Sequence, residues 1–177
     1  MLAYLRDTQH IPLQLEGDIN LTLNKWYTDA SFGTHPDLRS HTGGIMTMGR
    51  GSVQTYSSKQ KLNTRSSTEA KLVGADDIMS QLMWTKYFLE AQKLKVKTKL
   101  LQDNKSTMLF KEKGIDSTGK RSRHINIQYF YIKDCLDKGY LSIEYCGTDN
   151  MIADIMTKPL QGIKFRKFRR MILNEHR

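Results

Sequence analysis

The sequence is poor in cysteine and proline and lacks any long hydrophobic run. Its 177 residues include 2 cysteines and 3 prolines. Cys135 and Cys146 each stand alone, which argues against a disulfide framework or a paired-thiol zinc site and favours a reducing, intracellular setting. No segment approaches the roughly 18 apolar residues that a membrane span needs, and Arg6 and Asp7 interrupt the place of a signal-peptide core. We therefore expect no membrane partner.

Acidic residues are also in deficit. The chain has 18 Asp and Glu against 28 Lys and Arg, which gives a net charge of +10 and a pI of about 9.6. Such an excess is the expected electrostatic footprint of a phosphate-backbone partner. Charge alone does not separate this case from a basic protein without such a ligand. The length suits one domain with a sizeable core and short appendages.

Changes of hydrophobic period along the chain predict the order of strands and helices. Residues 25–32 alternate between two faces, and a glycine-rich turn at 49–51 joins two further extended runs, so three antiparallel strands are expected. From Glu69 onward, apolar residues recur at spacings of three, four, three and seven, which predicts one buried face of a long helix. They are Leu72, Ala75, Met79, Leu82 and Leu89. The remaining order is strand 96–103, helix 106–113, loop 116–123, helix 124–138, strand 140–145 and helix 150–158. The pattern predicts an α/β fold with a mixed five-stranded sheet, three antiparallel strands and then two parallel ones, flanked by helices.

Four acidic residues stand in distinct local settings. Asp29 lies within a strand of otherwise apolar and small residues, where a cation site explains a buried charge better than an ion pair does. The other three have structural alternatives. Glu69 completes a capping box that begins at Ser66. Asp103 suits an N-cap or a turn, and Asp154 suits the first turn of a helix.

These four carboxylates gain meaning as a set. In the expected sheet, the strands of Asp29 and Asp103 are neighbours, and two helix N-termini present Glu69 and Asp154 to the same point. Four converging carboxylates repel one another strongly without cations. Oxygen ligands suit magnesium, and two magnesium ions suit phosphodiester hydrolysis. We therefore predict Asp29, Glu69, Asp103 and Asp154 as catalytic residues and ligands of two Mg²⁺ ions, for which Mn²⁺ would substitute.

Six motifs, in order, resemble the ribonuclease H domain of copia-type LTR retrotransposons, which lies C-terminal to the reverse transcriptase in the Gag-Pol polyprotein. They begin at Tyr27, Tyr56, Ser66, Gln102, Arg123 and Ala153 and read YTDAS, YSSKQ, SSTEA, QDNKS, RHINI and ADIMTKPL. The resemblance covers residues 24–173. It implies a ribonuclease H-like fold and an enzyme that hydrolyses the RNA strand of RNA:DNA hybrids during reverse transcription, leaving a 3′-hydroxyl and a 5′-phosphate. It also implies an intracellular, cytoplasmic location in the virus-like particle of the element.

The resemblance assigns roles to the acids and divides the chain. Asp29 would bridge both metal ions, Glu69 and Asp103 would hold one, and Asp154 would help to hold the other. Residues 1–23 would be the tail of the preceding reverse transcriptase region and a linker, 24–160 the ribonuclease H domain, and 161–177 a basic C-terminal helix or tail. The reverse transcriptase domain of the same polyprotein would be a partner beside the hybrid.

One departure from the resemblance concerns a histidine. Many ribonucleases H carry a histidine in the loop between the last strand and the last helix, and the corresponding loop at 146–150 has none. His124 is an accessory candidate, with a helix N-terminal or packing role as the alternative.

Hybrid binding needs phosphate contacts on two strands and a means of sensing 2′-hydroxyl groups. Our candidates are Ser31, Lys59, Gln60, Arg65, Asn104, Lys120, Arg121 and Arg123. The basic residues at 120–123 are expected to contact the DNA strand, and the alternative is that they belong to a solvent-exposed loop without a ligand. A C-terminal helix docked through Phe165 and Phe168 is expected to be structural, and Trp26 and Trp84 are expected in the core.

Two other functions are compatible with parts of the pattern. One is a non-catalytic module for nucleic-acid binding or polyprotein assembly, which the presence of all four acids disfavours. The other is a DNA nuclease of the integrase or transposase type. Its usual acid order is Asp, Asp, Glu, whereas this chain runs Asp, Glu, Asp, Asp.

Overall fold

A mixed five-stranded sheet forms the centre of the molecule. The structure, a computed structural model, describes residues 2–17, 23–103 and 123–175, with residues 123–126 described by their backbone. The strands, in spatial order, are β5 (Gln54–Lys59), β3 (His41–Thr47), β2 (Leu23–Ser31), β6 (Lys97–Gln102) and β7 (Ser142–Tyr145). The first three pair antiparallel, and β6 runs parallel to both β2 and β7. This arrangement confirms the predicted α/β fold and sheet.

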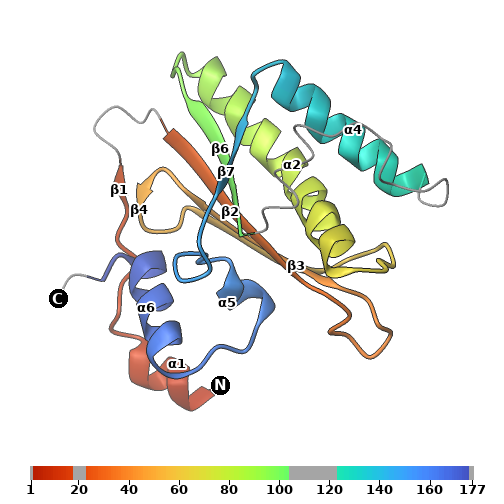
Figure 1. The fold of residues 1–177 in the computed structure, drawn as a ribbon. Helices are drawn as coiled ribbons and strands as arrows, with labels where there is room; N and C mark the ends of the chain where they lie inside the picture. The colour runs from red at the N-terminus through yellow and green to blue at the C-terminus, as the bar shows by residue number, and fades with distance from the viewer. Residues whose placement is uncertain (1, 18–22, 104–122, 176–177) are drawn as a thin grey trace.

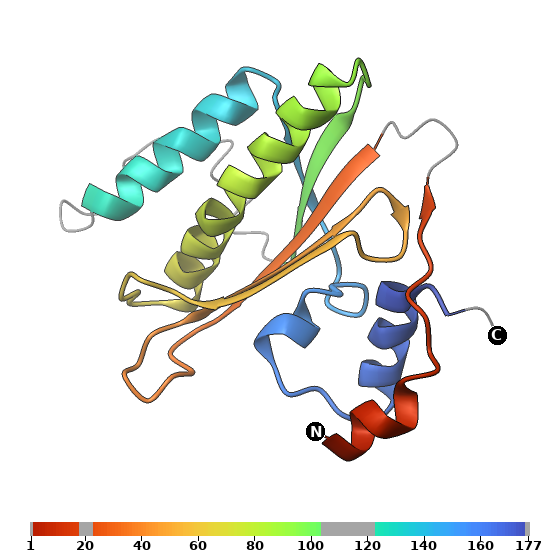
Figure 2. The same ribbon diagram turned by 180° about the vertical axis from the view of Figure 1, so that it is seen from behind.

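Helices cover both faces of this sheet. The long helix α2 (Ser67–Ala91) and α4 (Arg123–Asp137) lie on one face. The short helix α5 (Asp154–Thr157), α6 (Gly162–Leu173) and α1 (Leu2–Thr8) lie on the other (Figures 1 and 2). The predicted helix at 106–113 and most of the predicted loop at 116–123 lie outside the described residues. Within the described part of the chain, no helix combines the length and apolarity needed to cross a membrane.

The apolar stripe of α2 builds the main core. The predicted positions Leu72, Ala75, Met79, Leu82 and Leu89 are all buried. They pack with the sheet residues Trp26 and Leu100, which are fully buried. The 3.6-residue period therefore predicted the packed face of this helix correctly.

Trp84 corrects the expectation that both tryptophans lie in the core. Its side chain is 65% exposed, and its ring stacks on Phe88 with centroids 5.3 Å apart. Two residues along a helix correspond to a rotation of about 200°. Trp84 follows the buried Leu82 by two positions and therefore points to solvent.

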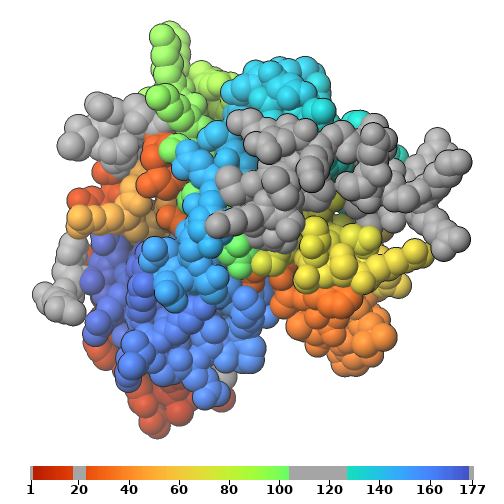
Figure 3. Space-filling view, viewed as in Figure 1, coloured from red at the N-terminus to blue at the C-terminus, as the bar shows by residue number. Residues whose placement is uncertain are grey.

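A second, smaller core lies on the face that carries α6. Phe168 is fully buried and clusters with Ile45 and Ile152, as the docking of an amphipathic C-terminal helix predicts. The residues of α5 and α6, coloured blue, form a continuous surface in Figure 3. Helix α1 joins this layer, because the ring of Tyr4 packs edge-on against Phe165 at 5.8 Å between centroids.

Two local features differ from the sequence expectations. Helix α5 begins at Asp154, whereas a helix over 150–158 was predicted, because residues 148–150 and 152–153 form turns before it. The predicted glycine-rich turn contains a short strand, β4 (Gly49–Arg50), which pairs with β1 (Glu16–Gly17) as a separate two-stranded ribbon. The ribbon joins the N-terminal segment to the rest of the fold.

Candidate functional site

Asp29 is the buried centre of the candidate site. It lies near the end of β2, flanked by β3 and β6, and its side chain has no exposed surface. The Thr157 hydroxyl donates a 2.6 Å hydrogen bond to Asp29 Oδ2, and Lys158 Nζ lies 3.1 Å from the same oxygen. Asp29 Oδ1 has no hydrogen-bond partner among the described residues, and Lys71 Nζ lies 3.8 Å from it. One oxygen is therefore tied to α5, and the other faces α2.

The charge state of Asp29 follows from these neighbours. Burial raises the pKa of its carboxyl, but the Thr157 hydrogen bond and the charges of Lys158 and Lys71 outweigh burial. The pKa of Asp29 is therefore lowered from its ordinary value, and the group is a carboxylate at neutral pH.

The strand next to β2 leaves room for α5. Gly43 of β3 pairs with Asp29, and a Cβ atom at Gly43 would lie 2.6 Å from Thr157 Cγ2 and 2.8 Å from Met156 Cβ. Only a residue without a side chain allows this approach. The glycine at position 43 therefore allows Thr157 and Lys158 to lie against the sheet beside Asp29.

Parallel pairing of β2 and β6 brings Asp103 to the site. Tyr27 of β2 pairs with Leu101 of β6. Asp29 follows Tyr27 by two residues, and Asp103 follows Leu101 by two residues, so the two acids lie at the same end of the strand pair. Lys71 of α2 donates a hydrogen bond from Nζ to Asp103 Oδ1. Because the same ammonium group lies 3.8 Å from Asp29 Oδ1, Lys71 links the two acids.

Asp154 reaches the site from the first position of α5, and its side chain is 1% exposed. Lys158 Nζ donates to its Oδ1 at 2.9 Å, and Lys164 Nζ donates to its Oδ2 at 2.7 Å. Lys158 therefore bridges Asp154 and Asp29. Burial lowers the pKa of Lys158, but the hydrogen bond to Asp154 and the charge of Asp29 outweigh burial and raise it.

Glu69 has the geometry of its structural alternative. Its Oε2 accepts a 2.7 Å hydrogen bond from the backbone N–H of Arg65, and its own N–H donates to Ser66 Oγ at 3.1 Å. The reciprocal pattern is a capping box whose carboxylate reaches one residue beyond the N-cap. The structure thus joins Asp29, Asp103 and Asp154 through lysines and engages Glu69 in the start of α2.

The residues present fit a hard divalent cation in donor type, and lysines separate them. Carboxylate oxygens are the donors that Mg²⁺ and Mn²⁺ prefer, and Asp29 Oδ1 is a buried acceptor without a hydrogen bond. Across the described ranges, no group of three or more His, Cys, Asp and Glu side chains lies close enough to hold a metal ion. The ammonium groups of Lys71 and Lys158 lie between the acids instead.

The predicted substrate-binding residues fall into different environments. Lys59 is on the exposed side of β5 and pairs with Asp37 at 2.9 Å, and Arg65 is exposed before α2. Ser31 is buried, and its Oγ lies 3.2 Å from the Thr34 hydroxyl.

Gln60 is 1% exposed, and its amide donates to Thr42 Oγ1 at 3.0 Å and to the Ala70 carbonyl at 2.8 Å. In this structure the Gln60 side chain therefore ties β3 to α2 and does not reach the surface. Asn104, Lys120 and Arg121 lie outside the described residues. Arg123 and His124 open α4, where the structure describes their backbone.

Sequence reasoning missed the lysines and the threonine that contact the acids. Lys158 follows Asp154 by four positions, so the helical i, i+4 spacing was an available signal. Lys71 reaches Asp103 only through the packing of α2 on β6, for which no local signal exists. Thr157 likewise contacts Asp29 across 128 positions of sequence.

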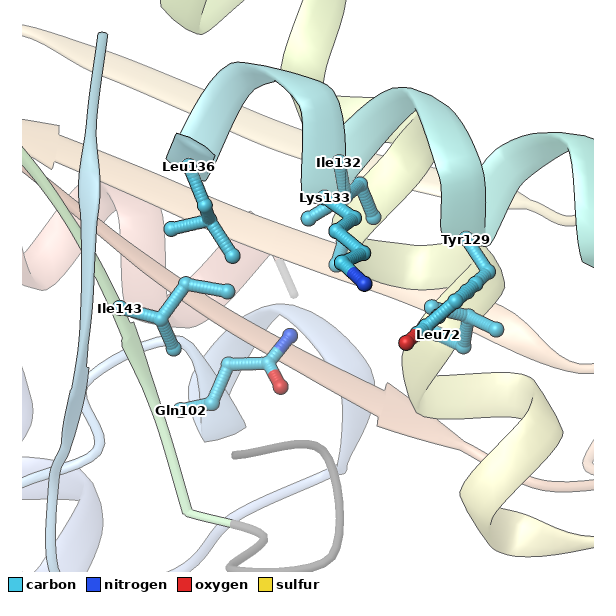
Figure 4. Close-up of a pocket in the computed structure, with 8 residues that line it drawn as sticks. Leu72, Gln102, Tyr129, Ile132, Lys133, Leu136 and Ile143 are labelled. Atoms are coloured by element: carbon cyan, nitrogen blue, oxygen red, sulfur yellow. The ribbon is translucent and has the colours of Figure 1, made fainter. Parts of the chain in front are cut away.

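A separate internal cavity lies between α2, α4 and the sheet. Its lining includes Leu72, Gln102 and Ile132, and Figure 4 shows the Gln102 amide and the Lys133 ammonium group pointing into it. Its volume of about 20 Å³ suits a single water molecule. The cavity is therefore too small for a nucleotide.

The chain is similar in sequence to a part of several transposon polyproteins. It is 28% identical over 174 residues to a retrovirus-related Pol polyprotein from transposon TNT 1-94 of Nicotiana tabacum. The aligned region covers 97% of this chain and 13% of that protein. It is 29% identical over 175 residues to the polyprotein of transposon RE2 of Arabidopsis thaliana, covering 97% and 12%. The Ty1-JR2 Gag-Pol polyprotein of Saccharomyces cerevisiae is 31% identical over 137 residues, covering 75% and 8%. The chain thus spans about an eighth of the plant relatives. No family model matches it.

Solved structures share the fold at low sequence identity. LC11-RNase H1, isolated from compost, superposes with a TM-score of 0.54 at 12% identity, covering 76% of this chain and 92% of that one. A foamy viral protease-reverse transcriptase in complex with an RNA/DNA hybrid gives a TM-score of 0.56 at 15% identity, covering 81% and 20%. The fold is therefore that of ribonuclease H.

Proposed function

We propose that this chain, which is homologous to part of the retrovirus-related Pol polyproteins of transposons and has the ribonuclease H fold, hydrolyses the RNA strand of RNA:DNA hybrids. The observation that carries the proposal is the position of Asp29. Asp29 is a buried carboxylate near the end of β2. Lys71 links it to Asp103, and Lys158 links it to Asp154. The homology to Pol polyproteins supports an enzymatic role for this cluster.

In this proposal, Asp29, Asp103, Asp154 and Glu69 hold two Mg²⁺ ions, with Mn²⁺ as a substitute. When bound, such ions lower the pKa of a water and stabilise charge on the phosphate oxygens. Asp29 is prepared for this task, because its pKa is lowered and the Thr157 hydroxyl fixes one of its oxygens. The cut would leave a 3′-hydroxyl and a 5′-phosphate.

Basic residues near the site would hold the hybrid. Lys59 at the end of β5 and Arg65 just before α2 are both exposed, and their charges suit contacts to phosphates of the RNA strand. We further propose that residues 24–160 form the catalytic domain, with the reverse transcriptase of the same polyprotein as partner. The setting would be the cytoplasmic virus-like particle of the element.

A second candidate function is a non-catalytic nucleic-acid-binding or assembly module. The contacts of Lys71 with Asp103 and Asp29 favour it, because a positive side chain there neutralises acids that a metal would need. The two functions differ in a single measurement, namely cleavage of the hybrid.

The test uses the purified chain, a hybrid with a labelled RNA strand, and duplex DNA of the same sequence. In Mg²⁺ or Mn²⁺ the protein should cut the RNA of the hybrid and spare the duplex DNA. Asp29→Asn and Asp103→Asn should lose activity by at least about 100-fold, since loss of a group that orients a metal already costs 10- to 100-fold. Hybrid binding without cleavage in both metals would select the second candidate, and cleavage of duplex DNA would contradict both.

A further inference from the structure

Two lysine ammonium groups lie in the intervals between Asp29 and its acidic neighbours. Lys71 lies between Asp29 Oδ1 and Asp103 Oδ1, and Lys158 lies between Asp29 Oδ2 and Asp154 Oδ1. A positive charge that lies near two carboxylates offsets their mutual repulsion. The chain therefore carries its own cations at the cluster.

The two lysines differ in how firmly they are enclosed. The Lys71 side chain is 19% exposed, and it contacts two acids whose side chains are 0% and 10% exposed. The Lys158 side chain is 41% exposed and comes from the end of the four-residue helix α5. Lys158 can turn outward more easily, so Lys71 is the stronger obstacle to a second cation.

We propose that Lys71 is a built-in counter-cation that competes with a divalent metal ion for the Asp29 and Asp103 carboxylates. It rests on the proposed function only for the identity of the metal. An ammonium group and a metal ion that bind the same two carboxylates repel each other at this distance, so each weakens the binding of the other. A metal ion therefore binds at this position only when Lys71 swings out along its flexible four-carbon stem.

This proposal separates two properties that a plain carboxylate site would combine. With Lys71 in place, the acid cluster is assembled and stable without metal, and its metal affinity is low. Without the ammonium group, Asp29 Oδ1 and Asp103 Oδ1 lose the positive charge that lies near both of them, so the protein is less stable in chelator and more responsive to metal. A neutral side chain at position 71 should therefore change stability and metal affinity in opposite directions.

The experiment compares Lys71→Gln with Lys99→Gln in the full 177-residue chain. Lys99→Gln is a matched control, since it removes the same positive charge. Lys99 is on β6 and pairs with the half-exposed Glu144 at 2.7 Å, away from Asp29 and Asp103. Calorimetric titration with MnCl₂, without nucleic acid, should show Lys71→Gln binding about tenfold more tightly than the parent, which corresponds to about 1.4 kcal/mol. Thermal melting in EDTA should show a lower Tm for Lys71→Gln, and Mn²⁺ should raise that Tm more than it raises the parent's.

Lys99→Gln and the charge-retaining Lys71→Arg should bind Mn²⁺ as the parent does. Equal Mn²⁺ affinity of Lys71→Gln and the parent, including no binding by either, overturns the proposal. So does an equal gain in Lys99→Gln. If the parent cleaves the hybrid and Lys71→Gln binds metal no better, the lysine proposal fails and the proposed function stands. If Lys71→Gln gains Mn²⁺ affinity and neither protein cleaves, the lysine proposal stands and the proposed function fails.

Discussion

Asp29 and Gly43 face each other across the antiparallel strands β2 and β3. The missing side chain at Gly43 leaves the space into which Met156 and Thr157 pack, and Thr157 then donates its hydrogen bond to Asp29. The acid and the glycine are thus parts of one arrangement. The glycine determines how closely α5 approaches the acid.

Replacing Gly43 by Ala should displace α5. The new methyl group would lie within 3 Å of Thr157 Cγ2 and Met156 Cβ, so α5 must shift, at a cost of about 1 to 3 kcal/mol in the free energy of unfolding. Urea unfolding measures the cost, and the hybrid assay should show lower activity. Gly147→Ala is the control, because a Cβ there meets nothing within 4 Å. Equal stability of both variants would contradict the tight seat of α5.

Glu69 can be tested for its two roles separately. Glu69→Gln keeps an oxygen that accepts the hydrogen bond from the Arg65 N–H, so the free energy of unfolding should change by less than about 0.5 kcal/mol. Activity on the hybrid should nevertheless fall strongly, because the amide is a poorer metal ligand. Glu69→Ala should lose activity and about 1 kcal/mol of stability. Full activity in Glu69→Gln would reduce Glu69 to a capping residue.

The lowered pKa of Asp29 predicts an acid-dependent loss of stability. A group whose pKa is lower in the folded state stabilises the fold fully above its unfolded pKa, close to 3.8, and that contribution disappears as the pH falls through the lowered value. As the pH falls from about 5 to below 3.8, the free energy of unfolding should therefore fall more for the parent than for Asp29→Asn. The raised pKa values of Asp76 and Asp77 act in the opposite direction, but both proteins share them. Parallel pH profiles would refute the ionised, paired state of Asp29.

Helix α6 should depend on one buried ring. Phe168 is fully buried against Ile45 and Ile152, so Phe168→Ala should cost about 3 to 5 kcal/mol of folding stability. Ile163 of the same helix is 80% exposed, and Ile163→Ala should change stability by less than about 0.5 kcal/mol. Chemical denaturation of the two variants makes the comparison. Similar small effects would show that α6 is dispensable for the fold.

Salt should weaken hybrid binding steeply. Each phosphate contact contributes about −0.7 to −0.9 to the slope of log affinity against log salt concentration. Arg65→Gln should remove about one phosphate contact and so make that slope shallower by about 0.7 to 0.9. Arg6 is a charge-matched control on α1, where its side chain is 75% exposed. A slope that both variants leave unchanged would remove Arg65 from the binding face.

The sequence predicted the sheet because its strands and its long helix carry clear periods. The buried stripe of α2 and the neighbouring positions of Asp29 and Asp103 both follow from these periods and from parallel pairing. For the same reason, the fold class and the pairing of the first and fourth strands could be predicted without knowledge of side-chain contacts.

The missed features depend on contacts between distant segments. The link from Lys71 to Asp103 joins α2 to β6, and neither segment alone indicates it. The exposure of Trp84 was missed for a different reason, because residue type was used where the helical position decides. The start of α5 at Asp154 follows from turns in the preceding segment, which acidic and apolar spacing does not reveal.

Helix α5 also provides a way to observe the site without any substrate. The amide of Met156 donates to the Ala153 carbonyl and that of Lys158 to the Asp154 carbonyl, both at 2.9 Å. These two amides lie in the same five residues that supply Asp154, Thr157 and Lys158 to the cluster. Their hydrogen-exchange rates therefore report whether this side of the cluster is assembled. An inactive variant in which these amides exchange slowly has lost catalytic activity with α5 in place. An inactive variant in which they exchange fast has lost the packing of α5 that supports the cluster.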